Sequence, residues 1–281
     1  MKKKPRSKDL GFKIYTHASA YFFTIVTLLP FLLLIITSLR SMQDIVSNGP
    51  LALPEEWIFS NYPKAWKMGN FAVYYKNSII CAVVTVVCVL VLTLLGAYTF
   101  AFLNFHGKSF FFSLILLGLL IPFQQIMIPL FHQLKNLRLL NTLWAIILPQ
   151  ISLQIPFGIF LLRGFMRELP MSVIESARLD GANEWQTLFY VVTPLVRTSL
   201  VALLIFTTMS SWNNFMLPTI MVQKDSLRTV PVGLNYFKDQ HFTDYPMMSA
   251  AANIIAFPII AIYLVFQRRM IQGMTVGSIK G

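Results

Sequence analysis

Six long runs of apolar residues divide the chain and predict its architecture. Apart from Arg197, none of these runs contains Lys, Arg, Asp or Glu; they cover residues 18–39, 78–103, 110–130, 143–162, 195–211 and 247–266. Each is close to the about 20 residues that an α-helix needs to cross a bilayer. Because a helix satisfies its own backbone hydrogen bonds in lipid, the pattern predicts an all-α integral membrane protein with six transmembrane helices.

Composition agrees with this pattern. The chain has 281 residues, of which 56% are hydrophobic and 12% are charged, whereas soluble domains average about 25% charged residues. No soluble domain, repeat or low-complexity tract is evident. We therefore expect a basic N-terminus over residues 1–17, one membrane domain over 18–266 and a tail over 267–281.

The positions of the basic residues predict the orientation. The net charge of +12 raises the question of nucleic acid, but in a membrane chain the location of the charge matters more. Lys and Arg in short loops mark the cytoplasmic side, and the N-terminus is rich in them: Lys2, Lys3, Lys4, Arg6, Lys8 and Lys13. We expect both termini in the cytoplasm, the basic cluster at anionic lipid and no nucleic-acid partner.

The sequence argues against ion-coupled transport, metal binding and nucleotide binding by this chain. All eleven Asp and Glu residues lie outside the runs or at their edges, whereas ion-coupled carriers usually keep ionisable groups within the bilayer. The histidines show no metal-ligand spacing. The segment "HGKS" at His106–Ser109 resembles the end of a phosphate loop, but Phe102 stands where that loop requires a glycine. We expect no catalytic residue, no metal and no cofactor on this chain.

The loop over residues 164–194 joins the fourth and fifth runs and faces the cytoplasm in this orientation. Its pattern predicts a helix from about Met171 to Leu179, a left-handed turn at Gly181 and a second helix start at Asn183. Ser172 and Glu175 have the spacing of a capping box. Two interpretations remain open: a docking knob for a partner, or an interfacial connector in which Glu175 only caps the helix.

The residues of this loop resemble a known signature. Glu175-Ser176-Ala177, Gly181, Val191 and Pro194 are similar to the E-A-A-x3-G-x9-I-x-L-P motif of ABC importer permeases, and "IESARLDGANEW" resembles its maltose-type, carbohydrate-uptake branch. Further segments across nearly the whole chain look alike, among them "IPFQQIMIPLF", "SWNNFMLP" and "FQRRMIQGMTVGSIKG". The chain departs from the motif at Ser176, Val191 and Thr193.

The resemblance implies the type I (MetI-like) importer permease fold, with ATP hydrolysis on a separate subunit. The loop would be a coupling helix that docks on a separate ATPase subunit through Glu175, Ser176, Ala177, Asp180, Gly181 and Pro194. The tail would reach between two ATPase subunits, with Gln272, Gly273, Lys280 and Gly281. ATP and magnesium would bind the ATPases. A second permease and an extracellular or periplasmic solute-binding protein would complete the assembly.

Two further groups of residues are candidates for contacts with the transported solute and the binding protein. Sugar sites usually combine aromatic faces with amide and hydroxyl groups, and these are supplied by Gln124, Gln125, Trp212, Asn213 and Asn214. The alternative for each is an interfacial aromatic or an interhelical amide bond. Asn235, Tyr236 and Phe237, within "VGLNYFKDQHF", are the candidate contacts for the binding protein.

Together these observations predict a function. We expect a multi-pass permease subunit in a bacterial or archaeal plasma membrane that imports a carbohydrate, an oligosaccharide in the first instance, without modifying it. A different solute, such as a polyol or a glycerol phosphodiester, is the alternative within transport. A membrane enzyme or a non-transport scaffold is the alternative from another class.

Overall fold

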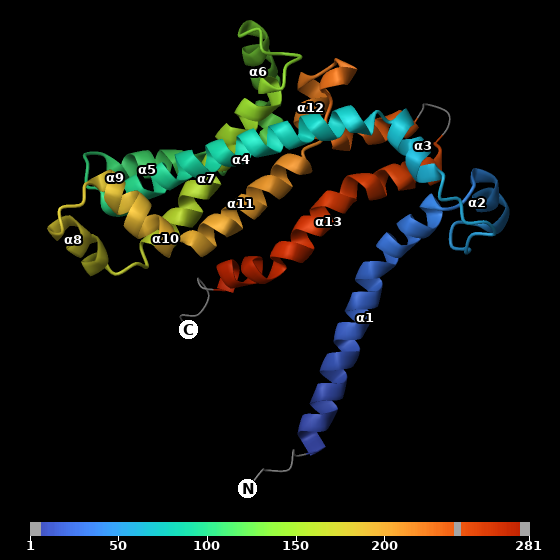
Figure 1. Cartoon of the computed structure of the whole chain (residues 1–281), viewed down its shortest axis with the longest axis horizontal. Helices are drawn as coiled ribbons and strands as arrows, with labels where there is room; N and C mark the ends of the chain where they lie inside the picture. The colour runs from blue at the N-terminus through green and yellow to red at the C-terminus, as the bar shows by residue number, and fades with distance from the viewer. Residues whose placement is uncertain (1–6, 239–242, 276–281) are drawn as a thin grey trace. The chain divides into compact units, whose positions relative to one another are not determined.

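The computed structural model describes residues 7–238 and 243–275, and its regular structure there is helical (Figure 1). The long helices are α1 (Ser7–Ser38), α4 (Phe71–Phe102), α7 (Trp144–Met166), α11 (Arg197–Trp212) and α13 (Tyr245–Thr275). Shorter helices are α2 (Met42–Asn48), α3 (Asn61–Met68), α5 (Lys108–Leu117), α6 (Phe123–Asn136), α8 (Met171–Leu179), α9 (Glu184–Gln186), α10 (Thr193–Leu195) and α12 (Met216–Met221). A π-helix, η1 (Thr187–Val192), and the 3-10 helices η2 (Asp225–Leu227) and η3 (Val230–Phe237) complete the set.

Four of these helices are long and apolar enough to cross a membrane. They are Tyr15–Ser38, Phe71–Phe102, Trp144–Met166 and Tyr245–Gln267. A fifth span results if Glu184–Leu195 and Arg197–Trp212, which meet at 80°, are counted as one. The all-α prediction is confirmed, whereas the count of six spans stays a prediction.

The third apolar run shows why the count differs. The run at 110–130 predicts one helix, but α5 ends at Leu117 and α6 begins only at Phe123. Between them Pro122 adopts an extended conformation, with φ −62° and ψ 134°. Proline has no N–H to continue a helix and disfavours helical geometry in the residue before it, so the run is divided here.

The chain forms two compact units, each described by itself. One comprises Met1–Gly69 and Leu234–Ala256, and the other Asn70–Gly233 and Phe257–Gly281. In the larger unit, α4 packs chiefly on α7 and α11. The loop between α7 and α11 belongs to the same unit, so its position relative to these helices is defined.

Close approach between α4 and α7 depends on two glycines. A Cβ atom added at Gly158 of α7 would lie 2.6 Å from the Thr93 methyl group of α4, and one at Gly96 would lie 2.7 Å from Ile159. In lipid, helices associate through such close packing rather than through the hydrophobic effect. The small residues therefore determine how near the two helices come.

In the smaller unit, a buried ion pair holds the chain that follows α1. Arg40 is fully buried and donates from Nε and an Nη to the two carboxylate oxygens of Asp44, at 2.8 and 2.9 Å, and to the Gly49 carbonyl at 2.8 Å. These bonds hold the pKa of Asp44 well below its usual range. Asn61 donates to the carbonyls of Ser38 and Arg40, so the C-terminal end of α1 is capped as well.

The glycine contact yields a prediction with a control on the same helix. Gly158→Ala should destabilise the folded chain by about 1–3 kcal/mol, because the new methyl group overlaps Thr93. Gly164→Ala is the control, since a Cβ there meets nothing within 4 Å. Thermal unfolding in detergent measures both. Equal stability of the two variants would contradict the tight α4–α7 contact.

Candidate functional site

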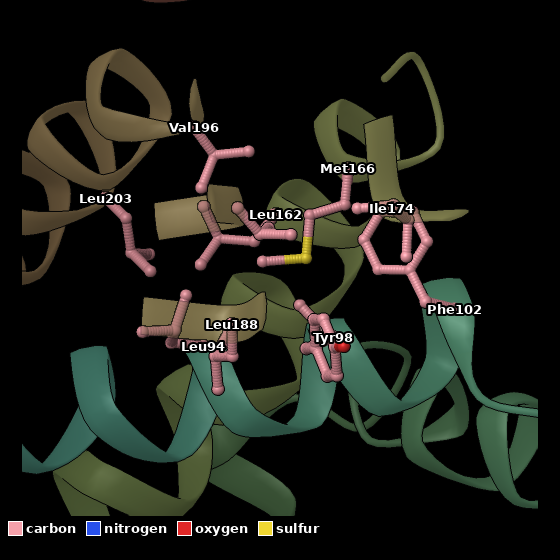
Figure 2. Packing of buried hydrophobic residues seen from close by; sticks show 11 residues of the cluster. Leu94, Tyr98, Phe102, Leu162, Met166, Ile174, Leu188, Val196 and Leu203 are labelled. Atoms are coloured by element: carbon pink, nitrogen blue, oxygen red, sulfur yellow. The ribbon is translucent and has the colours of Figure 1, made fainter. Parts of the chain in front are cut away.

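The loop at 164–194 rests on a buried hydrophobic cluster. The cluster joins α4, α7, α8, η1 and α11, and its side chains point into one shared space (Figure 2). Ile174 of α8 and Val192 of η1 are fully buried within it, and Leu188 is nearly so. The underside of the loop is therefore held by the membrane helices and cannot be offered to a partner.

The opposite side of the loop is accessible. Of the six residues predicted to dock, Ala177 is half-buried and the rest are exposed: Glu175, Ser176, Asp180, Gly181 and Pro194. Apolar side chains accompany them, with Leu179 88% and Trp185 62% exposed. The Trp185 ring stacks on Phe189 at an interplanar angle of 9°. The loop thus presents exposed apolar side chains beside acidic groups that include Glu175 and Asp180, a mixture found at docking surfaces.

The predicted glycine turn is present. Gly181 has φ +86°, a left-handed conformation that side chains other than glycine rarely adopt. Its N–H binds the Arg178 carbonyl at 3.1 Å, and the Ala182 N–H binds the Ala177 carbonyl at 3.0 Å. These two bonds form a Schellman motif, which ends α8 and reverses the chain.

One of the two predicted caps is present and the other is not. The Asn183 Oδ1 accepts from the Gln186 N–H at 2.9 Å, and the Gln186 Oε1 accepts from the Asn183 N–H at 2.8 Å. At the start of α8, however, the N-cap is Pro170 and no side chain caps the helix. The predicted capping box of Ser172 and Glu175 is wrong, because Pro170 already sets the helical entry and Ser172 lies inside the first turn.

A π-helix leads from the loop into α11. η1 covers Thr187–Val192, and the Thr193 hydroxyl donates to the Leu188 carbonyl at 2.7 Å. Pro194 follows and supplies no N–H to the preceding turn. The chain then bends by 80° at Val196, between Glu184–Leu195 and Arg197–Trp212. Thr193, a departure from the family motif, therefore bonds to the backbone where the helix is irregular.

A polar contact that sequence reasoning missed joins the loop to α4. The Tyr98 hydroxyl donates to Glu184 Oε2 at 2.5 Å, and Arg178 lies 3.0 Å from Glu184 Oε1. Together with Trp185, Tyr98 and Glu184 also line a half-open cavity of about 300 Å³. Tyr98 and Glu184 lie 86 positions apart, so no local signal could have paired them.

The candidate solute contacts are spread over two segments. Gln124 and Gln125 are exposed in the first turn of α6, whereas Trp212 is buried and meets the Tyr75 ring of α4 edge to face at 5.4 Å. Asn213 is exposed, and Asn214 accepts from the Leu217 N–H at 3.1 Å. Within the described chain, no hydrogen bond joins the glutamines to the asparagines.

A buried amide that was not among these candidates joins α4, α7 and α11. Gln150 of α7 is 2% exposed, and its Oε1 accepts from Ser211 of α11 at 2.6 Å and from Thr85 of α4 at 3.3 Å. The three residues bind the three central helices to one another. An amide inside the apolar run at 143–162 was the available signal.

The three candidate contacts for the binding protein differ in their exposure to solvent. Asn235 and Tyr236 are exposed, but Phe237 is 6% exposed and packs against the Tyr236 ring. The Phe237 side chain is therefore covered within this chain, and its role as a contact stays a prediction.

The tail residues are only partly covered by the structure. Gln272 and Gly273 lie in α13, which continues to Thr275, so the predicted tail begins as helix. Lys280 and Gly281 lie outside the described residues, as do the basic residues at positions 2–4 and 6.

Comparison with known proteins identifies the family. Residues 92–276, which include the whole loop, match the model of the "Binding-protein-dependent transport system inner membrane component" family. The chain belongs to this family. Members are transport permeases rather than enzymes, and the family description itself names a binding protein and the inner membrane.

Two relatives show how far the similarity to other permeases extends. The chain is 33% identical to the diacetylchitobiose uptake system permease protein NgcG of Streptomyces coelicolor, over 98% of this chain and 91% of that one. It is 32% identical to the arabinooligosaccharides transport system permease protein AraQ of Halalkalibacterium halodurans, over 92% and 94%.

Solved structures show that the permease has the importer fold. A chain of a bacterial ABC transporter involved in the import of alginate aligns with a TM-score of 0.80 at 23% identity, covering 95% of this permease and 99% of that chain. A chain of the alginate transporter in complex with its pentasaccharide-bound periplasmic protein aligns with a TM-score of 0.68 at 16% identity, covering 94% and 96%.

The turn at Gly181 gives a prediction about the loop of the permease. Gly181→Ala should destabilise the turn by about 1 kcal/mol, because a Cβ is strained at this φ although nothing lies within 4 Å of it. Amide exchange at Ala182 should then rise about fivefold. Gly181→Asn is the control, since asparagine tolerates the left-handed region, and its exchange should rise less. Equal effects of the two variants would contradict this explanation.

Proposed function

We propose that this permease is the transmembrane subunit of an ATP-driven importer of carbohydrate, specifically of oligosaccharides. The observation that supports it best is the similarity, at about a third identity over nearly the whole chain, to permeases named for diacetylchitobiose and arabinooligosaccharides. The fold match to an alginate importer points to the same class of solute. The permease moves the sugar and leaves its bonds intact.

In this proposal the loop at 164–194 is the coupling element. It faces the cytoplasm, as the Lys and Arg distribution favours, and docks in a separate ATPase subunit that binds ATP and magnesium. The geometry supports the role because the underside is buried while Glu175, Asp180 and Leu179 remain accessible. Because the loop is packed on α4, α7 and α11, a movement of the bound ATPase displaces these helices as well.

The proposal specifies an assembly. A second, homologous permease completes the pathway, two ATPase subunits bind the cytoplasmic loops, and a solute-binding protein delivers the sugar from outside.

The test is to capture the tagged permease from its native membranes in mild detergent and to identify co-purifying proteins by mass. We expect a second permease and an ABC ATPase. Capture of the chain alone, under conditions that preserve other membrane complexes, would overturn the importer function and favour a scaffold.

A single carboxylate tests the docking site. Glu175→Ala should reduce the recovered ATPase about tenfold, the effect of removing one contact residue worth about 1.4 kcal/mol. The helix should persist, because no side chain caps α8. Glu168→Ala is the matched control, since Glu168 is another exposed acid of the same loop and lies outside the docking set. Undiminished recovery with Glu175→Ala would place docking elsewhere.

A further inference from the structure

Helix α4 ends in a tyrosine–carboxylate–arginine triad on the side of the coupling loop. The Tyr98 hydroxyl donates to Glu184, and Glu184 pairs with Arg178 of α8. Tyr98 is 3% exposed, and its ring packs in the hydrophobic cluster beneath the loop. The hydroxyl is thus held in place by packing, and the hydrogen bond transmits that position to the chain between α8 and η1.

The other end of α4 carries a second tyrosine–carboxylate–arginine triad, with an aspartate in place of the glutamate. The Tyr74 hydroxyl donates to Asp225 Oδ1 at 2.5 Å, and Arg228 lies 3.4 Å from the same oxygen. Asn70 donates to Asp225 Oδ2 at 3.2 Å. The hydrogen bonds from Tyr74 and Asn70, together with the charge of Arg228, lower the pKa of Asp225. Tyr74 is 2% exposed.

Further bonds join the first turns of α4 to the segment at 225–230. The Asn77 amide donates to the carbonyls of Ser226 and Arg228, both at 2.9 Å, and the Val230 N–H binds the Ser78 hydroxyl at 2.9 Å. These partners lie about 150 positions away in sequence. The segment at 225–230 is therefore held by α4 rather than only by its own neighbours.

The helix between the two triads is suited to act as one rigid body. Tyr74 and Tyr98 are separated by 24 residues, or about 36 Å along an α-helix, slightly more than the roughly 30 Å of hydrocarbon. No proline interrupts Phe71–Phe102. The glycine contacts of Gly96 and Gly158 fix its path against α7.

We propose that α4 is a two-ended strut that transmits motion between the coupling loop and the segment at 225–230 through its two tyrosine–carboxylate–arginine triads. Tyr74 and Tyr98 are positioning residues, because each acts through the carboxylate that its hydroxyl binds. The assignment of the two ends to the outside and the cytoplasm rests on the proposed function. The competing explanation is that each triad anchors only its own loop.

Nucleotide-dependent hydrogen exchange separates the strut from local anchoring. The assembled complex in lipid nanodiscs is measured with and without ATP, magnesium and orthovanadate, a probe that acts on the ATPase side. In the wild type, exchange across residues 223–230 should change when the probe binds. Tyr98→Phe keeps the ring and removes only the hydroxyl, and should reduce that distant change about tenfold, as expected for the loss of a hydrogen bond to a charged group.

Tyr190→Phe is the matched control. Tyr190 is 79% exposed on the same loop, so loss of its hydroxyl leaves the buried contacts beneath the loop intact. It should respond as the wild type does. Tyr74→Phe should also lose the distant response, and the double variant should lose no more than either single variant, because both changes interrupt one element.

The outcomes separate failure of the strut from failure of the proposed function. If Tyr98→Phe loosens only the coupling loop and residues 223–230 still respond, or if the two single effects add, the triads are local anchors and the strut is overturned. If the wild-type complex binds its ATPases but residues 223–230 do not respond, the strut is also overturned. If no ATPase assembles with the wild-type chain, the proposed function fails first.

Discussion

Close packing between α4 and α7 is the contact on which the rest of the larger unit depends. Gly96 and Gly158 let the two helices approach until a methyl group would no longer fit. Because lipid tails are as apolar as the side chains they surround, such packing and a few buried hydrogen bonds hold membrane helices together. The amide of Gln150, bonded to α4 and α11, adds the polar part of this contact.

The loop at 164–194 is built on these packed helices. Its helices bury Ile174, Leu188 and Val192 in the cluster between α4 and α7, while its chain reversals come from local chemistry at Gly181 and Asn183. One side of the loop is therefore held by packing against the helices, and the opposite side is exposed. This combination is what the proposed coupling role needs, because a partner can bind the exposed side while the buried side contacts the helices.

Two polar triads bond the two ends of α4 to neighbouring loops. A buried tyrosine hydroxyl is strongly directional, and a carboxylate receives it at each end of the helix. Hydrogen bonds of this kind weaken when the donor and acceptor are displaced or misaligned. Their strength is therefore more sensitive to a small movement of the helix than apolar packing is. The helix that is packed most closely in the unit is also the helix bonded to the loops at both of its ends.

The sequence by itself determined the features that depend on neighbouring residues. Apolar runs predicted helices, and the turn at Gly181 and the capping box of Asn183 followed from backbone preferences that act over a few positions. The family motif within Glu175–Pro194 could be read in the same way. Local rules failed where two signals competed: Pro122 divided an apolar run, and Pro170 displaced the predicted cap at Ser172.

Tertiary structure alone decided which distant residues meet. The pairing of Tyr98 with Glu184, and of Tyr74 with Asp225, joins residues that are separated by 86 and 151 positions. Burial of Phe237 and the interhelical bonds of Gln150 are of the same kind. The physical reason is that helix periodicity specifies which residues share a face, whereas the partner of that face is chosen by packing over the whole unit.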